Sequence, residues 1–241
     1  MVAMKKVAPV ILSIVLLFGS ARPQLGGFGS GYDKPLAGFE SHREPAIQAI
    51  LRLGLESKVP IGIIETDEQL CKAKVDVAAQ GQTPLQIIAA LIAQVSGYSW
   101  SVKDGVLSVQ PANMPDGPVR LLSIAIPRFA APEGTLDSQR AILWMQIRGV
   151  LEPGEGTAVS VMRSLKAQTF PPIDMSNATV EQILDRIVSR APGGAWVLFP
   201  LPKQSEWRDK LDVRFIAAFS YGEEASKVRD VSCQPYGGNS P

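Results

Sequence analysis

The sequence contains few of the residues on which metal sites and hydrolase sites are commonly built. Its 241 residues include one histidine, His42, and two cysteines, Cys71 and Cys233. These three residues are widely separated and show no metal-ligand spacing, so we expect no metal site. No Gly-x-Ser-x-Gly motif accompanies His42, which lies in a polar stretch. A solvated surface histidine is therefore the simplest interpretation of this residue.

The sequence also lacks a cofactor motif and an excess of charge of either sign. The glycines between positions 26 and 31 are not followed by the Lys-Ser/Thr pair of a phosphate loop, so we expect no cofactor. Lys and Arg number 24 against 23 Asp and Glu, which gives a formal net charge of +1. No basic stripe with interleaved aromatic residues is present, and this argues against a nucleic-acid partner.

A long apolar run occurs at the N-terminus and nowhere else. Lys5 and Lys6 precede an apolar segment from Val7 to Phe18, which is followed by Gly19-Ser20-Ala21. This pattern is typical of a secretory signal peptide with cleavage after Ala21, because the apolar segment is shorter than the ~20 residues of a bilayer span. We therefore expect an exported protein, periplasmic or secreted, without stable membrane insertion after cleavage.

Two stretches that lie 96 residues apart follow the same pattern. Thr, Gln, Gly and Trp recur in register, and apolar residues recur between them. The matched positions are Thr83, Gln86, Gly97 and Trp100 in the first stretch and Thr179, Gln182, Gly193 and Trp196 in the second. Self-similarity at one offset indicates a duplicated supersecondary unit.

The repeat has a direct structural interpretation. Thr followed three residues later by Gln predicts a capping box at the start of a helix. The apolar residues between Ile87 and Val95 then form one stripe on that helix, and the equivalent stripe runs from Ile183 to Ala191. Each glycine falls where its stripe ends and so predicts the helix terminus. Each Trp opens a strand, where we expect it to lock the strand onto the helix.

The first repeat belongs to a larger predicted unit, residues 39–111. Asp104-Gly105 between two alternating runs is a strong signal for a hairpin with a type I′ turn. The predicted elements of this unit are a helix at Ala46–Leu55, strands at Ile61–Glu65 and Lys74–Val77, a helix at Leu85–Val95, and a hairpin from Tyr98–Val102 to Val106–Val109.

The second repeat belongs to a similar predicted unit, residues 119–202. Its predicted elements are a strand at Leu121–Ile126, a helix at Ser138–Leu151, strands at Val159–Val161 and Ile173–Met175, a helix at Ile183–Ala191 and a strand at Ala195–Phe199, with an edge strand added by Val213–Tyr221. The fold class is therefore α+β, with two small duplicated domains that each pack two helices on short mixed β-sheets. The remaining segments are a signal peptide at 1–21, a Gly-rich linker at 22–38, a linker at 112–118 and a partly disordered C-terminal extension at 203–241.

Residues 39–111 resemble the secretin and TonB short N-terminal domain (STN), and residues 119–202 resemble it more weakly. The resemblance rests on the amphipathic helix, the Ile61–Glu65 and Val75–Val77 strands, the Gln80–Thr83 approach to the second helix, and the closing hairpin. It implies a small periplasmic βαββαββ module without catalytic residues. Members of the family usually sit at the periplasmic end of an outer-membrane barrel or secretin and bind protein partners.

Cys71 and Cys233 form an even pair in a chain that we expect to be exported. A disulfide between them would close a long loop and stabilise the fold by up to roughly 5 kcal/mol. The alternative, a reactive thiol, has no Cys-x-x-Cys motif to support it. The sequence alone leaves both readings open.

The remaining polar candidates have simple structural explanations. Carboxylates gather at Asp67-Glu68, at Glu152 and Glu155, and at Glu223-Glu224, all in polar, loop-like stretches where solvated charge is the ordinary outcome. An acid pair for glycoside chemistry is the alternative reading. Asn177-Ala178-Thr179 is formally a glycosylation sequon, but Thr179 is already explained as a helix cap.

Three function classes follow from the sequence. The first is a non-catalytic envelope protein that binds another envelope protein, by strand addition at an edge such as Ile61–Glu65. The second is a secreted hydrolase with His42 in a site between the domains. The third is a secreted ligand-binding or inhibitor protein that uses the inter-domain groove, with Trp144, Trp196 or Trp207 as an exposed platform. The sequence identifies neither the partner nor the oligomeric state.

Overall fold

A computed structural model of the chain describes residues 31–66, 68–151, 168–199 and 214–219. The predicted signal peptide, the predicted strand at Val159–Val161, Trp207 and Cys233 lie outside the described residues. The described elements, in chain order, are β1 (Phe39–Pro45), α1 (Ala46–Ser57), β2 (Ile61–Ile64), α2 (Gln69–Lys72), β3 (Lys74–Ala79), α3 (Pro84–Ile92), β4 (Tyr98–Lys103), β5 (Val106–Pro111), α4 (Asp116–Ser123), β6 (Ala125–Ala131), α5 (Leu136–Leu151), β7 (Ile173–Thr179), α6 (Val180–Val188), β8 (Ala195–Phe199) and β9 (Arg214–Phe219).

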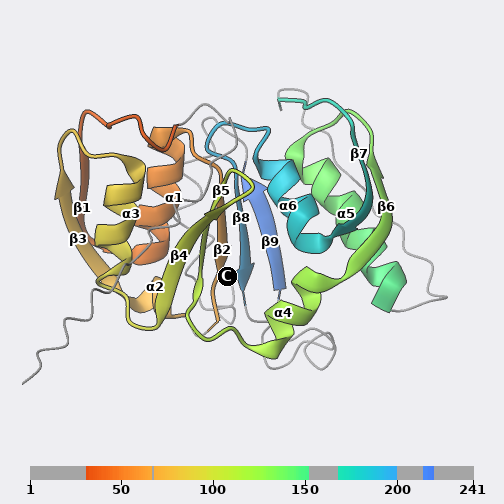
Figure 1. The fold of residues 1–241 in the computed structure, drawn as a ribbon, viewed down its shortest axis with the longest axis horizontal. Helices are drawn as coiled ribbons and strands as arrows, with labels where there is room; N and C mark the ends of the chain where they lie inside the picture. The colour runs from red at the N-terminus through yellow and green to blue at the C-terminus, as the bar shows by residue number, and fades with distance from the viewer. Residues whose placement is uncertain (1–30, 67, 152–167, 200–213, 220–241) are drawn as a thin grey trace, which may run out of the picture.

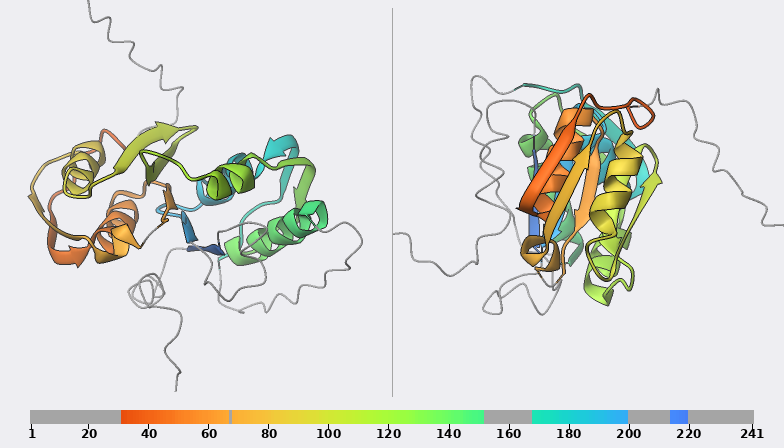
Figure 2. Two further views of the ribbon diagram at one scale, coloured as in Figure 1. Left: turned by 90° about the horizontal axis from the view of Figure 1, so that it is seen from below. Right: turned by 90° about the vertical axis from the view of Figure 1, so that its left-hand side faces the viewer.

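These helices and strands form an α+β fold, as the sequence predicts, and they are stacked in five layers (Figures 1 and 2). A five-stranded sheet in the order β4-β5-β2-β8-β9 forms the central layer. Helices α1 and α3 cover one face of it, and the antiparallel pair β1-β3 covers those helices. Helices α5 and α6 cover the opposite face beneath the antiparallel pair β6-β7. We call β1 to β5 the first unit and α4 to β9 the second unit.

The central sheet runs through both units. Strand β2 of the first unit pairs in parallel with β5 on one side and with β8 of the second unit on the other. The β2–β8 register places Gly62 opposite Trp196, and flanking bonds from Ile61 N to Gly194 O (2.9 Å) and from Glu65 N to Leu198 O (2.8 Å) extend the pairing. The predicted edge strand at Ile61–Glu65 is therefore wrong in position, because β2 is the middle strand of five.

Alternation along β8 divides its side chains between two hydrophobic cores. Ala195 and Val197 face the core of the first unit, whereas Trp196 and Leu198 face the core of the second. Side chains of a strand point alternately to opposite faces, so a strand covered by helices on both sides contributes to both cores. Strand β2 does the same, with Ile63 in the first core and Ile64 in the second. The two units thus share their sheet and bury it jointly.

The capping boxes of the repeat are confirmed. Thr83 with Gln86 and Thr179 with Gln182 both form complete capping boxes at the starts of α3 and α6. The helices end before the predicted glycines, because α3 and α6 stop at Ile92 and Val188 with C-caps at Ala93 and Ser189. Gly97 and Gly193 lie in the turns that follow and have φ angles of +77° and +71°. Such angles are readily adopted by glycine and suit the change of direction into the next strand.

The predicted hairpin is also confirmed. Asp104 and Gly105 have φ angles of +50° and +77° at the tip between β4 and β5, as a type I′ turn requires. Both units therefore contain a two-stranded antiparallel sheet and a capped helix that leads into a strand of the central sheet. Whether this likeness arose by duplication stays a prediction.

Other elements differ from the sequence prediction. The strand predicted at Leu121–Ile126 is wrong in its first half, because α4 covers Asp116–Ser123 and also takes up part of the predicted 112–118 linker. Leu121 and Leu122 are both buried, so their apolar character reflects the buried face of a helix. Strand β1 was not predicted. Strand β9 lies at the edge of the central sheet, as predicted for Val213–Tyr221.

The described part of the predicted Gly-rich linker packs against the first unit. Tyr32 is 8% exposed and belongs to the first core. The backbone N–H of Leu36 donates to Gln82 O, and Leu36 O accepts from Gly81 N. The glycines of this stretch suggested a flexible chain, whereas the buried tyrosine anchors its last residues.

We predict that Gly62→Ala lowers the free energy of unfolding by about 1–3 kcal/mol, because a Cβ there would lie 2.4 Å from Cζ2 of Trp196. Gly149→Ala on α5 is the matched control, since nothing lies within 4 Å of its added Cβ. The control should be neutral or stabilising by up to about 1 kcal/mol. Urea unfolding monitored by circular dichroism measures both changes. Equal effects of the two substitutions would contradict the proposed close packing of Gly62 against Trp196.

Candidate functional site

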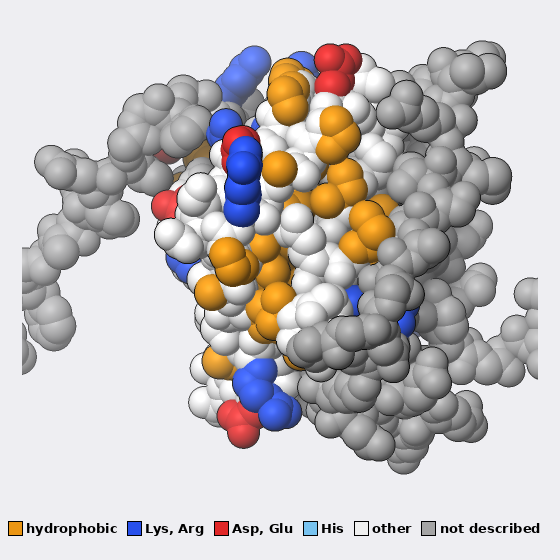
Figure 3. Space-filling view, turned by 90° about the vertical axis from the view of Figure 1, so that its right-hand side faces the viewer, with side chains coloured by type: hydrophobic (Ala, Val, Ile, Leu, Met, Phe, Trp, Pro, Cys, Tyr) orange, Lys and Arg blue, Asp and Glu red, His pale blue; other side chains and the backbone are white. Residues whose placement is uncertain are grey.

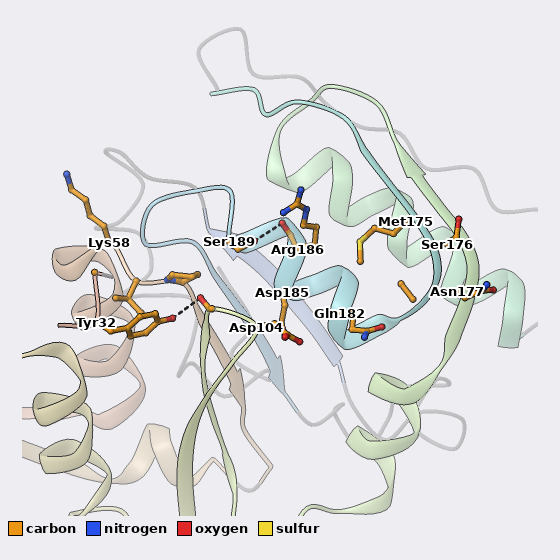
Figure 4. A pocket seen from close by; sticks show the side chains of 15 residues that line it. Tyr32, Lys58, Asp104, Met175, Ser176, Asn177, Gln182, Asp185, Arg186 and Ser189 are labelled. Atoms are coloured by element: carbon orange, nitrogen blue, oxygen red, sulfur yellow. Dashed lines mark hydrogen bonds between the residues drawn. The ribbon is translucent and has the colours of Figure 1, made fainter. Parts of the chain in front are cut away.

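The two units also meet where the tip of the β4–β5 hairpin reaches α6. Lys103 at the end of β4 forms an ion pair with Glu181 of α6, with 2.6 Å between Nζ and Oε2. A cavity of about 600 Å³ lies beside this contact. Figure 4 shows Tyr32, which precedes β1, and Asp104 of the first unit on one side of the cavity and Gln182 and Asp185 of α6 on the other.

Asp185 is the most unusual residue of this cavity. Asp185 is 7% exposed, and its Oδ1 accepts a 2.7 Å hydrogen bond from Nε1 of Trp196. Burial raises the pKa of Asp185 to about 7; the nearby carboxylates of Glu181 and Asp104 raise it further, whereas the Trp196 hydrogen bond and Lys103 lower it. A carboxyl group with this pKa can either hold or release a proton near neutral pH.

Tyr32 lies on the other side of the cavity and fixes the segment before β1. Its hydroxyl donates a 2.7 Å hydrogen bond to Gly105 O at the hairpin tip. Burial, reinforced by the charge of Asp185, raises the pKa of Tyr32 well above its usual value. Tyr32 therefore remains a neutral hydrogen-bond donor, and it ties the hairpin tip to the first core.

The cavity has the carboxyl groups of Asp104 and Asp185 but no recognisable catalytic arrangement among the residues that the structure describes. Of its serines, Ser176 and Ser189, the second is occupied within α6: its Oγ donates to Arg186 O, and its backbone N–H donates to Asp185 O rather than to the carboxyl group. His42 lies on β1 in an outer sheet, where its side chain is 77% exposed and 3.9 Å from both Glu40 and Asp76. The histidine is thus a surface residue, as the sequence indicated, and it does not line the cavity.

The outer edge of β4 is a second candidate site. β4 ends the central sheet, and no other described strand pairs with its outer side. Trp100 at its centre is only half-buried against the first core, whereas Trp196, which β2 covers, is 1% exposed. The two tryptophans of the repeat therefore differ in what surrounds them. The predicted use of Trp196 as an exposed platform is wrong, and Trp144 is half-buried beside the second core.

The remaining predicted residues lie apart from these two sites, with two exceptions. Gln182, predicted as a helix cap, and Asn177, the sequon residue, both line the cavity. Glu68 forms an ion pair with Lys72 on α2. The other predicted carboxylates lie outside the described residues; they are Asp67, Glu152, Glu155, Glu223 and Glu224.

The structure describes Cys71 but not its predicted disulfide partner, Cys233. Cys71 packs beside the first core and is not a free thiol. Cys233 lies outside the described residues, so the disulfide between the two stays a prediction.

Sequence reasoning missed Asp185 and Tyr32. Asp185 directly follows Leu184 in the apolar stripe of α6, and an aspartate inside such a stripe was the available signal. Its partner Trp196 could not be identified from the sequence, because the bond depends on how β8 packs against α6. Tyr32 was missed because it lies in a glycine-rich stretch that we interpreted as a flexible linker.

The outer face of the second unit, which includes the β6-β7 pair, has a mixed surface. Figure 3 shows hydrophobic side chains scattered among polar surface on this face. Among the described residues, the large hydrophobic side chains that are exposed are Val119 of α4 and Val150 of α5. Within the same residues, no cluster of histidine, cysteine and acidic side chains could hold a metal ion. No helix in the described ranges is both long enough and apolar enough to span a bilayer.

Comparisons with protein-family models, with curated proteins and with solved structures found no match to this chain.

We predict that Asp185→Asn stabilises the protein increasingly as the pH rises. Between pH ~4 and ~7 the native Asp185 holds a proton that the unfolded chain releases, so this residue makes stability fall with rising pH. An asparagine at this position still accepts the Trp196 hydrogen bond but carries no charge. The gain over the wild type should be small at pH 4 and reach roughly 1–4 kcal/mol at pH 8.

Urea unfolding at a series of pH values measures this difference. Asp33→Asn, at an exposed position, is the matched control and should follow the wild type at every pH. A gain from Asp185→Asn that does not change with pH would show that the carboxyl group titrates alike in the folded and unfolded protein.

Proposed function

We propose that this chain is a non-catalytic, exported envelope protein that binds a partner protein by accepting an extended segment along the outer edge of β4. The observation that carries this proposal is the open edge of β4 together with its half-buried Trp100. An exposed strand edge presents unpaired backbone N–H and C=O groups and is a ready template for another strand.

The molecule contains an example of the same interaction between its own units. Strand β8 follows a Thr-Gln-capped helix and a glycine with positive φ, as β4 does. The edge of β8 that faces away from β9 is occupied by β2, and this pairing buries Trp196 almost completely. Strand addition at β4 would give Trp100 an equivalent cover.

The sequence of β4 leaves its edge accessible. Native proteins often protect an edge strand with proline or with several charges. β4, with the sequence YSWSVK, has no proline and carries a single lysine at its last position, where Lys103 is paired with Glu181. Alternate residues of an antiparallel ladder direct their backbone groups away from the neighbouring strand, so part of the β4 backbone is available to a partner.

Two sequence features support the location and the class of partner. The basic residues, apolar run and small residues of the first 21 positions support export. The resemblance to the secretin and TonB short N-terminal domain supports a protein partner in the envelope. The order β1-α1-β2-β3-α3-β4-β5 in the first unit, apart from the short α2, agrees with the βαββαββ order that this resemblance implies.

A pull-down with residues 22–241, the chain expected after signal cleavage, tests the proposal. Ser101 is exposed at the centre of β4, and Ser101→Lys places an uncompensated charge on the edge. We expect it to reduce capture of an envelope protein by about tenfold or more, which corresponds to at least ~1.4 kcal/mol. Quantitative mass spectrometry of the retained proteins measures the change.

Ser123→Lys is the matched control, because Ser123 is equally an exposed serine but lies at the end of α4. It should capture the same protein as the wild type. Capture that survives Ser101→Lys unchanged, or that is lost in both variants, would contradict binding at the β4 edge.

Binding of a small ligand in the cavity beside Asp185 is the second candidate. Its volume of about 600 Å³ lies within the range of ligand-binding pockets, and polar groups from both units converge on it. A thermal-shift screen of small polar compounds tests this role. A compound that stabilises the wild type but not Gln182→Leu would support it, because Gln182 lines the cavity.

A further inference from the structure

We propose that the segment accepted by β4 runs parallel to it and places a glycine directly opposite Trp100. This inference rests on the proposed function, and it specifies the chemistry of the partner segment. The partner is an extended stretch in which the residue opposite Trp100 has no side chain and the residue two positions later is apolar.

The contact between β2 and β8 provides the template. Gly62 is paired with Trp196, and the indole lies so close that a Cβ on Gly62 would be 2.4 Å from Cζ2 and 2.5 Å from Cε2. The indole therefore covers the backbone of the added strand, and any side chain at that position would displace it. Two positions further along, Ile64 is paired with Leu198, and both side chains belong to the second core.

Trp100 stands in β4 where Trp196 stands in β8. Each follows, at the same spacing, a glycine with positive φ that lies between a capped helix and the strand, and each turns toward the core of its own unit. Val102 likewise packs against its own core, in the place of Leu198. The indole of Trp100 is half-buried, so part of its surface is open for an incoming strand.

The opposite face of β4 shows that the partner contributes a strand rather than a helical layer. Ala195 and Val197 of β8 are covered by the first core, which belongs to the unit that supplies β2. The corresponding residues of β4 are Ser99 and Ser101, and Ser101 is exposed. Serines at these positions fit a solvated face, so the partner residues opposite them should also be polar.

The strand direction is inferred from the β2–β8 pair. Carbonyl groups of Gly194 and Leu198 accept hydrogen bonds from β2 in the parallel arrangement. Tyr98 and Val102 occupy the corresponding positions of β4. A second copy of this chain cannot supply the segment from its own β2, because that strand is already paired on both sides. The segment that we infer therefore comes from a different protein rather than from β2 of a second copy.

A synthetic peptide tests the inference directly. It carries residues 59–66 of this chain with Ile61→Thr and Ile63→Thr, so that the positions opposite Ser99 and Ser101 are polar while Gly62 and Ile64 are kept. Fluorescence anisotropy of the labelled peptide, titrated with residues 22–241 of the protein, measures binding. We expect the same peptide with Gly62→Val to bind about tenfold more weakly or worse.

The site and the direction are tested with the same peptide. Ser101→Lys in the protein should weaken its binding, and Ser123→Lys should not. A nitroxide at the C-terminal end of the peptide should broaden the amide NMR signal of Lys103 more than that of Tyr98, because parallel strands end on the same side.

Each outcome bears on a separate statement. Equal binding of the glycine and valine peptides, with loss in Ser101→Lys, would overturn the glycine requirement and leave strand addition at β4 standing. Broadening centred on Tyr98 would overturn the parallel direction. Absence of binding by both peptides would overturn this inference as a whole, and the pull-down with Ser101→Lys would then decide the proposed function independently.

Discussion

The parallel pairing of β2 with β8 is the contact on which the architecture depends. It joins the two units through backbone hydrogen bonds and makes each strand contribute to two cores. The pairing also brings Trp196 over Gly62, and the indole N–H then reaches Asp185. A glycine in β2 thus permits the close approach, a tryptophan in β8 fills it, and an aspartate in α6 satisfies the buried donor. Because an unsatisfied buried donor is costly, these three residues act as one unit.

The same contact connects the two candidate sites. On one side, Asp185 is held in a buried position at the wall of the inter-unit cavity, where loss of hydration raises its pKa to about 7. On the other, the β2–β8 pair shows how a strand that follows a capped helix can accept another strand. β4 has the same local arrangement with an open edge. The proposed binding site is therefore a second use of a packing arrangement that already stabilises the fold.

Predictions from the sequence were correct where the local structure depends on residues that are close in the sequence. The capping boxes at Thr83 and Thr179, the hairpin turn at Asp104-Gly105 and the α+β class follow from interactions within a few positions of the chain. The predictions failed where burial by distant elements overrides a local pattern. Leu121 was assigned to a strand because its neighbours alternate, but it lies on the buried face of α4. The β2 strand was assigned to an edge because nothing local reveals two neighbours.

The sequence by itself determined the repeat, the Thr-Gln helix caps and the hairpin turn, since these depend on the spacing and the chemistry of neighbouring residues. The tertiary structure alone decided that β2 occupies the centre of a sheet shared by both units, and that Trp196 is buried while Trp100 is half-buried. The tertiary structure also decided that the carboxyl group of Asp185 is buried and desolvated. The physical reason is that pairing of strands distant in the chain, and the desolvation that follows, depends on the packing of the whole molecule. Two matching Thr-Gln-Gly-Trp patterns therefore lead to two different surroundings, one closed and one open.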